Sequence, residues 1–243
     1  MEGLRWAFGC GFWQPTRHEW LLAARCVQAE ERERIGAFVF ARDAKAAMGG
    51  RLLIRKLIAE RLKIPWNEIQ LQRTTKGKPF LANPVFTTIP NFNFNISHHG
   101  DYTVLAAEPN LQVGVDVVKT DFPGSRSVAE FFRIMNRQFT GYEWNTIKMA
   151  GDEWAQLGMF YRHWETILDD NHHVAVALGK PDMFGKYPAQ VQENTNQEPP
   201  KFTLLSFKDL ISSAIAMAPE DLTCWENFQI KQEKPSRQHQ MSV

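Results

Sequence analysis

The spacing of apolar residues predicts that the first half of the chain alternates between strands and helices. Phe92, Phe94 and Ile96 alternate with asparagines, so they share one face of a half-buried strand. Apolar residues between Phe38 and Leu62 recur instead at a mostly helical period. The first half is thus predicted to contain strands at Leu4–Trp13, Ile69–Gln72, Asn91–Ile96, Thr103–Ala107 and Gln112–Lys119, and helices at Thr16–Val27 and Phe38–Leu62.

The second half has few predicted strands for its helices. Ser127 with Glu130, and Thr140 with Glu143, have the spacing of capping boxes that begin helices. The predicted elements are helices near 128–136, 141–149 and Asp152–Trp164, strands at His172–Leu178 and Phe202–Ser206, and a helix from Leu210. Residues 186–200 are polar and contain prolines, which predicts a loop, and 231–243 are predicted to form a disordered tail.

This order of elements predicts an α+β protein made of two halves of similar content. The predicted halves are residues 1–108 and 109–230, joined near Glu108–Leu111. The shortage of strands points to elements lacking between Trp164 and Asn171, so the second half is predicted to be shortened there.

Composition excludes several classes of protein. Of the 243 residues, 44% are hydrophobic and 23% are charged, as in ordinary globular proteins. No apolar run approaches the ~18 residues of a membrane-spanning helix, and the N-terminus does not resemble a signal peptide. Cys10, Cys26 and Cys224 are odd in number and scattered, which argues against a disulfide scaffold or zinc finger and favours a reducing compartment.

Charge is distributed unevenly along the chain. Residues 31–78 hold twelve Lys or Arg against five Asp or Glu, while the whole chain carries a net charge of +1. A basic segment beside an acidic remainder indicates an anionic ligand, of which phosphates are the commonest. For residues 42–63 alone, a solvated helix face is the simpler interpretation.

Two short segments carry groups suited to holding phosphate. Arg73–Pro79 (RTTKGKP) places three cations around a glycine turn, but it lacks the glycine and lysine spacing of a nucleoside-triphosphatase P-loop. Asn95–Gly100 ends a strand with Ser97 and His98, whose hydroxyl and imidazole suit a phosphate. Nucleic-acid binding stays open, because clustered lysines also contact phosphate backbones.

The carboxylate of Asp116 is placed in an otherwise apolar strand. Val113, Val115 and Val117 share one face, and Asp116 lies on the other. A buried carboxylate must be paired, hydrogen-bonded or bound to a metal, and Mg²⁺ with a phosphate is one such partner. A structural pairing with Arg or Lys is the alternative. No serine hydrolase motif is present, and His172 and His173 point to opposite faces of a strand, which disfavours a metal site.

These three segments together resemble the large, Sfp-like class of 4′-phosphopantetheinyl transferases. The resemblance rests on R-T-x-K-G-K-P, F-N-I-S-H-x-G and G-V-D-V in this order and spacing, and residues 30–79 are similar to animal members. It implies two pseudo-symmetric α+β halves that bind coenzyme A between them. It further implies that Arg34, Arg73, Lys76, Lys78, Ser97 and His98 bind coenzyme A, and that Asp116 is the Mg²⁺ ligand and catalytic residue.

The sequence departs from this family after Trp164. Family members continue W-x-x-K-E, whose Glu ligates Mg²⁺, whereas here Glu165 follows directly and a later family strand begins soon after. Glu165 and Asp169 are nearby carboxylates, and we expect neither to replace the missing Glu. In the family, the Lys of this motif contacts phosphate. Without that Lys and the Mg²⁺-binding Glu, we predict much reduced or no turnover.

The resemblance therefore implies a cytosolic, monomeric enzyme that modifies acyl and peptidyl carrier domains, with no nucleic-acid or membrane partner. A catalytically inactive form that binds coenzyme A or a carrier domain is the first alternative. A nucleic-acid-binding module built on residues 31–78 is the second.

Overall fold

A computed structural model describes residues 2–83, 92–120, 127–136, 140–153, 155–156, 166–179 and 201–233. The chain forms two compact units, one made of Met1–Asp116 with Val176–Lys234, the other containing Val117–Ala175. This division reflects how the backbone packs. The boundary predicted between residues 108 and 109 divides the chain instead into two halves of similar predicted content, and it stays a prediction.

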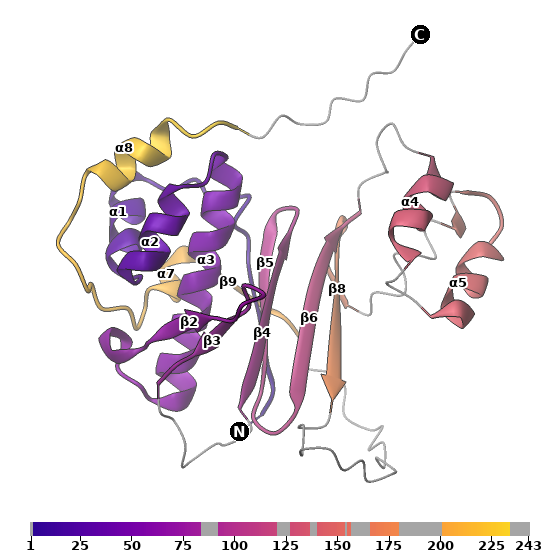
Figure 1. Ribbon diagram of the computed structural model, residues 1–243, viewed down its shortest axis with the longest axis horizontal. Coiled ribbons are helices and arrows are strands. Elements are labelled where there is room, and N and C mark those ends of the chain that lie inside the picture. Colours follow the sequence, from indigo (N-terminus) through magenta and orange to yellow (C-terminus); the bar gives the residue numbers. More distant parts are fainter. Residues whose placement is uncertain are drawn as a thin grey trace. The chain divides into compact units, whose positions relative to one another are not determined.

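The described elements are mixed α and β, in agreement with the predicted α+β class (Figure 1). In chain order they are β1 (Leu4–Phe8), α1 (Arg17–Arg25), α2 (Ala29–Gly36), α3 (Ala41–Leu57), a π-helix (Ile58–Leu62), a 3₁₀ helix (Trp66–Glu68), β2 (Leu71–Arg73), β3 (Pro79–Leu81), β4 (Asn93–His99), β5 (Tyr102–Glu108), β6 (Gln112–Lys119), α4 (Val128–Ile134), α5 (Gly141–Lys148), β7 (Thr166–Asp169), β8 (His172–Gly179), β9 (Thr203–Leu205), α7 (Phe207–Leu210) and α8 (Thr223–Gln229).

A four-stranded sheet in the order β4-β5-β1-β9 forms the centre of the first unit. Strand β1 pairs with β5 antiparallel, with Leu4 opposite Ala107, and with β9 parallel. Every residue of β1 and β5 is buried, because both strands lie inside the sheet and beneath the helices. The helices of this unit lie together on one side of the sheet in Figure 1.

One ion pair is buried in this sheet. The Arg5 guanidinium on β1 lies 2.5 Å from the Glu108 carboxylate at the end of β5, and both residues are less than 10% exposed. Arg5 also donates to the carbonyl oxygens of Leu4 and Ala107. Both charges therefore have partners at the point where β1 and β5 meet.

Helix α3 approaches the sheet closely through two adjacent glycines. A Cβ atom at Gly49 would lie 2.6 Å from Cδ1 of Phe8 on β1, and one at Gly50 would lie 3.2 Å from Cδ1 of Ile96 on β4. Leu52, Leu53 and neighbouring residues of this helix are fully buried. Because Gly49 and Gly50 have no side chains, α3 can lie this close to β1 and to β4, the strand that carries part of the candidate site.

We expect Gly49→Ala to destabilise the protein. The added methyl group meets a buried aromatic ring, and overpacking of this kind costs about 1–3 kcal/mol, against a gain of about 1 kcal/mol from helix propensity. The measurement is urea-induced unfolding followed by circular dichroism. Gly36→Ala is the control, because a Cβ added there would have no atom within 4 Å, and it should cost nothing. Because both variants gain the same helix propensity, a Gly49→Ala protein as stable as Gly36→Ala would contradict this view of the packing.

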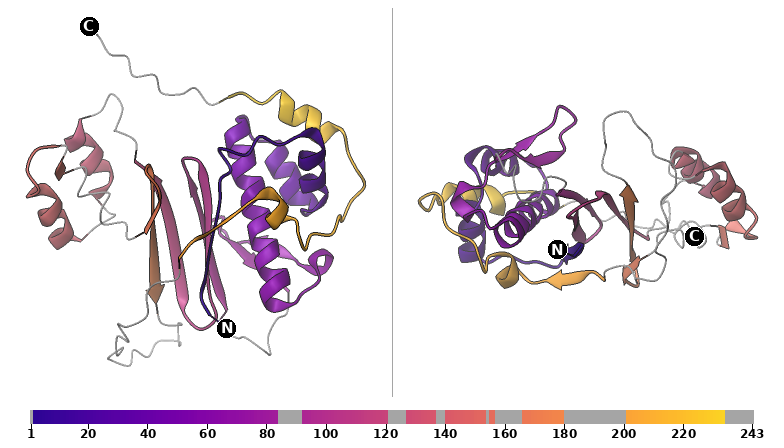
Figure 2. Two further views of the ribbon diagram at one scale, coloured as in Figure 1. Left: turned by 180° about the vertical axis from the view of Figure 1, so that it is seen from behind. Right: turned by 90° about the horizontal axis from the view of Figure 1, so that it is seen from below.

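The C-terminal segment returns to the first unit. Strand β9 pairs with β1, α7 packs on α3, and the segment runs past α3 when seen from behind (Figure 2). Helix α8 packs on α1, where the Trp20 indole N–H donates to the carbonyl oxygen of Cys224. Gln232 bonds to the backbone of Val39 and Ala41. Residues 231–233 are thus held in place, which corrects the predicted tail at its start; 234–243 lie outside the described residues.

The second unit has a small core of its own. Val118, Val128, Phe132, Trp144 and Ile147 form one buried cluster beneath α4 and α5. Strands β6, β8 and β7 form a sheet in that order, with β7 and β8 antiparallel. The predicted capping box of Thr140 and Glu143 begins α5. Ser127 caps α4 by accepting from the Glu130 N–H, and the described contacts include no return bond from the Glu130 side chain. The pseudo-symmetry of the halves stays a prediction.

Several predicted elements need correction. The first strand ends at Phe8 and not at Trp13, and the expected helix from Leu210 is α7, which already ends there. Helices α2 and α8 and strands β3 and β7 are absent from the elements that the sequence predicts. The predicted loop at 186–200, and most of the predicted helix Asp152–Trp164, lie outside the described residues.

Candidate functional site

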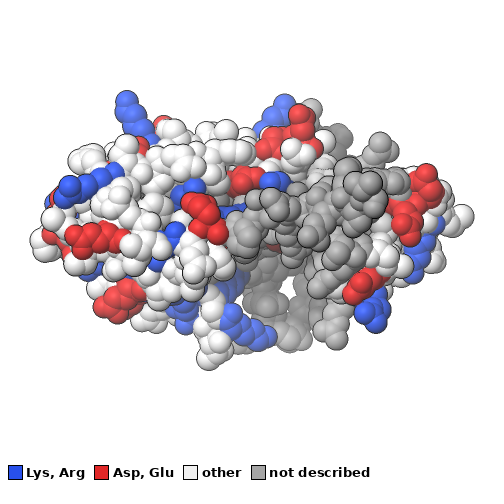
Figure 3. All heavy atoms as spheres, turned by 90° about the horizontal axis from the view of Figure 1, so that it is seen from above, with Lys and Arg blue, Asp and Glu red and all other residues white. Residues whose placement is uncertain are grey.

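A pocket of about 420 Å³ lies within the first unit, between α2, α3, the β2–β3 turn and β4. Five of the predicted ligand-binding residues line it: Arg34, Arg73, Lys76, Lys78 and His98. Phe38, Phe94 and Ile96 add apolar surface. In Figure 3, basic side chains gather towards the lower side of the left-hand part of the described surface. The pocket therefore combines clustered positive charge with an apolar wall.

The β2–β3 turn presents two of these cations. The Gly77 N–H donates to the Thr74 carbonyl oxygen at 2.8 Å, and the Thr74 N–H donates to the Lys78 carbonyl oxygen at 2.9 Å. Gly77 has a φ of +81°, a left-handed conformation that favours glycine. The tight turn leaves Lys76 and Lys78 exposed on either side of Gly77, at the rim of the pocket.

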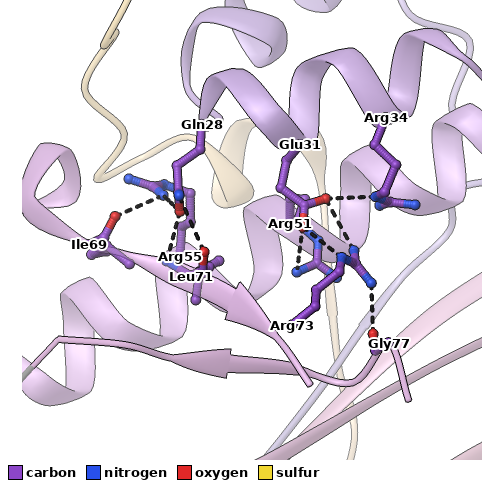
Figure 4. A network of polar contacts seen from close by, with 9 residues as sticks. All are labelled: Gln28, Glu31, Arg34, Arg51, Arg55, Ile69, Leu71, Arg73 and Gly77. Atoms are coloured by element: carbon purple, nitrogen blue, oxygen red, sulfur yellow. Dashed lines mark hydrogen bonds and ion pairs between the residues drawn. The ribbon is translucent and has the colours of Figure 1, made fainter. Parts of the chain in front are cut away.

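A buried carboxylate holds the arginines of the pocket (Figure 4). Arg73 donates from Nε to Glu31 Oε1 at 2.9 Å and from Nη2 to Oε2 at 3.1 Å, while Arg34 Nε donates to Oε2 at 2.9 Å. Arg51 Nη1 on α3 lies 3.6 Å from Glu31 Oε1. Residues of α2, α3 and β2 thus converge on a single acid.

These contacts shift the pKa values of the acid and of one base. Burial raises the pKa of Glu31, but hydrogen bonds from Arg73 and the charges of Arg51 and Arg34 outweigh it, so the pKa lies below its usual value. The pKa of Arg51 is lowered to about 10, chiefly by burial and also by the charges of Arg73 and Arg34, while the charge of Glu31 opposes the shift. At neutral pH the cluster therefore holds three cations and one anion.

Ser97 and Asp116 lie together beside this pocket but do not line it. The Ser97 hydroxyl donates to Asp116 Oδ1 at 2.6 Å. The side chains of Asn93 and Asn95 accept from the N–H groups of Val113 and Val115, so polar side chains of β4 hold the edge of β6. Because residues alternate along a strand, Ser97 faces β6 while its neighbours Ile96 and His98 face the pocket.

Asp116 is exposed, so the expected buried carboxylate is instead open to solvent, with one oxygen bonded to Ser97. In the described part of the chain, no group of three or more His, Cys, Asp or Glu side chains is arranged to hold a metal ion. Mg²⁺ commonly takes only one or two protein carboxylates and completes its shell with water and substrate phosphates. A single exposed carboxylate next to a cationic pocket fits that donor set.

Two residues of the site, Glu31 and Arg51, are missed by sequence reasoning. Both lie in the basic segment, where Arg51 is one cation among twelve. The spacing of Glu31 and Arg34, three residues apart on a helix, is the available signal. It carries little weight in a segment where the sequence predicts no helix.

A second hollow, of about 520 Å³, lies within the second unit between α4 and α5. Arg133, Lys148 and Glu153 line it together with Phe132 and Trp144. Its mixed charge suits phosphate less well than the first pocket. Separately, none of the helices in the described ranges combines the length and apolar character that crossing a bilayer requires.

Comparison with known proteins links the chain to one family. A sequence profile described as "4′-phosphopantetheinyl transferase, N-terminal" matches residues 11–110. The L-aminoadipate-semialdehyde dehydrogenase-phosphopantetheinyl transferase of Homo sapiens is 49% identical over 291 residues, covering 98% of this chain and 94% of the human protein. The Xenopus laevis protein of the same name is 48% identical over 98% of the chain and 95% of its own length. The 4′-phosphopantetheinyl transferase Sfp of Bacillus subtilis is 28% identical over 57% of the chain and 55% of its own length.

The 291-residue alignment with the human protein is longer than the 243 residues of this chain. That protein therefore contains residues that have no counterpart here.

Proposed function

Because the chain belongs to the 4′-phosphopantetheinyl transferase family, we propose that it transfers the 4′-phosphopantetheine group from coenzyme A to a serine of apo acyl or peptidyl carrier domains. This proposal rests above all on the pocket of the first unit. Its cations belong to the segments that carry the family resemblance, and they face one cavity.

Coenzyme A carries a pyrophosphate and a 3′-phosphate, and the pocket has the charge to bind them. Arg34 and Arg73 supply planar guanidinium donors, which match phosphate geometry, and Lys76 and Lys78 supply mobile point charges at the rim. Phe38, Phe94 and Ile96 provide an apolar wall for the adenine ring. His98 and Ser97 add donors along β4.

We further propose that Asp116 is the Mg²⁺ ligand. When bound, the ion would offset the charge of the pyrophosphate. Ser97 helps to orient the Asp116 carboxylate by donating to its Oδ1 atom. In the transfer, the carrier serine hydroxyl gives up its proton to water, its oxygen bonds to the β-phosphorus of coenzyme A, the bond from that phosphorus to the bridging oxygen breaks, and adenosine 3′,5′-bisphosphate leaves.

The second half is proposed to be shortened after Trp164, with the W-x-x-K-E motif absent. The excess length of the human alignment supports this view. We propose that turnover is consequently low, and that the protein acts as a cytosolic monomer without nucleic-acid or membrane partners.

A transfer assay tests the proposed function. The chain is incubated with an apo carrier domain, Mg²⁺ and coenzyme A labelled in the pantetheine group, and label on the carrier is measured over long times so that slow turnover is detected. We expect label that depends on both the enzyme and the carrier serine. A carrier domain with its serine replaced by alanine is the control, and equal labelling of both domains would contradict the proposal.

The human protein contains residues that have no counterpart in this chain, and this also favours a second candidate, a form that binds coenzyme A without transferring it. A binding titration beside the same assay separates the two. Tight binding with no transfer would favour the binding-only form, whereas transfer to the carrier serine would exclude it.

A further inference from the structure

Arg51 stands apart from the other buried cations of the first unit. Its side chain is only 6% exposed, yet its Nε and Nη1 atoms have no hydrogen-bond partner among the described residues. Glu31, the acid with which it pairs, lies at 3.6 Å, beyond hydrogen-bonding distance, and is already bonded to Arg34 and Arg73. Leaving charged donors buried without acceptors is costly.

A second arginine of the same helix gives the contrast. Arg55 lies one turn further along α3, is 1% exposed, and burial lowers its pKa to about 10, as for Arg51. Its guanidinium donates to the carbonyl oxygens of Ile69 and Trp66 and to the side chain of Gln28. Of the Arg55 nitrogens, only Nε lacks a hydrogen-bond partner among the described residues, whereas both Nε and Nη1 of Arg51 lack one.

Arg51 lines the basic pocket, whereas Arg55 does not. Around the pocket, Glu31 offsets only one of the three guanidinium charges that contact it. An anion in the pocket would supply both the missing acceptors and the missing negative charge.

We propose that Arg51 is a further phosphate-binding residue of this pocket, and that Glu31 is the positioning residue that holds the guanidinium groups of Arg51, Arg34 and Arg73 towards the bound phosphate. This inference rests on the proposed function, because it takes a phosphate group of coenzyme A as the ligand. Glu31 fixes Arg73 through two hydrogen bonds and Arg34 through one, so the arginine donors are ordered before the ligand arrives.

The direction in which Glu31→Gln changes the affinity for coenzyme A separates a positioning role of Glu31 from a purely electrostatic one. Glu31→Gln removes a negative charge beside a site for anions, so charge alone predicts tighter binding. Positioning predicts the reverse, since the neutral amide offers one acceptor in place of two and the arginines lose their fixed orientation. We expect coenzyme A to bind Glu31→Gln about tenfold more weakly.

The test is calorimetric titration of the full chain with coenzyme A and with 3′-dephospho-coenzyme A. We expect Arg51→Met to weaken binding of coenzyme A by about 10- to 100-fold, the usual worth of a hydrogen bond to a charged group. Weakening for coenzyme A alone would assign the contact to the 3′-phosphate, and equal weakening for both ligands would assign it to the pyrophosphate. Arg55→Met is the matched control, and we expect it to lower the melting temperature while leaving both affinities unchanged.

Should Arg51→Met fail to fold, Arg51→Lys takes its place, because it keeps the charge and loses the planar guanidinium that can donate two parallel hydrogen bonds; about tenfold weaker binding is expected. Folded Arg51 variants that bind both ligands as tightly as the unchanged chain would overturn the role of Arg51. Tighter binding by Glu31→Gln would overturn the role of Glu31. Failure of the unchanged chain itself to bind coenzyme A would instead contradict the proposed function.

Discussion

Replacing Asp116 with asparagine is expected to reduce transfer of phosphopantetheine at least about 100-fold. Asparagine has nearly the same shape and can still accept the hydrogen bond from Ser97, so the edge between β4 and β6 should stay intact. What it loses is the negative charge that Mg²⁺ requires of its protein ligand. The measurement is the rate at which labelled coenzyme A modifies a carrier domain.

Binding of coenzyme A without Mg²⁺ provides the control for Asp116. The residue does not line the basic pocket, so Asp116→Asn should bind coenzyme A about as tightly as the unchanged chain when the ion is left out. A variant that transfers the group within about threefold of the unchanged rate would show that the Asp116 carboxylate is not the metal ligand.

The parts of the site that could be predicted from sequence are those encoded by contiguous motifs. Arg73, Lys76 and Lys78 surround one glycine turn, and His98 ends one alternating strand, so local geometry alone sets their mutual positions. Their arrival in the same pocket as Arg34 agrees with the resemblance and with the charge pattern. Their roles in binding stay predictions.

Glu31 and Arg51 could not be predicted because their environment is tertiary. Arg51 lies among apolar residues of α3, and only the approach of α2 and β2 makes it part of an arginine cluster. Helix α2 lacks a side-chain cap at Gln28 and carries few apolar residues, so neither period nor capping marks it. Helix formation there depends on packing against α3.

Long-range pairing explains the remaining errors in the fold. Strand β9, predicted at Phe202–Ser206, is confined to the three residues that pair with β1, which lies near the opposite end of the chain. Helix α8 has no fully buried residue and no side-chain cap, and it is held by contacts with α1. Ser206 and Asp209 form a capping box at the start of α7, a local signal that the predicted start at Leu210 does not use.

Reversing the charge of the two lysines at the pocket rim is expected to have the second large effect. Lys76 and Lys78 are both exposed, so Lys76→Glu with Lys78→Glu should leave the fold intact. If each lysine contacts a phosphate group of coenzyme A, loss of both contacts and the new repulsion should weaken binding at least about 100-fold. Lys201→Glu with Lys208→Glu is the matched control, because both lysines are exposed in the same unit, lie outside the pocket, and change the net charge equally.

Calorimetric titration of coenzyme A into these two double variants and the unchanged chain tests most directly whether the basic pocket of the first unit is the coenzyme A site. We expect the control variant (Lys201→Glu with Lys208→Glu) to bind nearly as tightly as the unchanged chain. The rim variant (Lys76→Glu with Lys78→Glu) should bind at least about 100-fold more weakly. Equal affinity of the rim variant and the control variant would refute the assignment, because the pocket would then not be where coenzyme A binds.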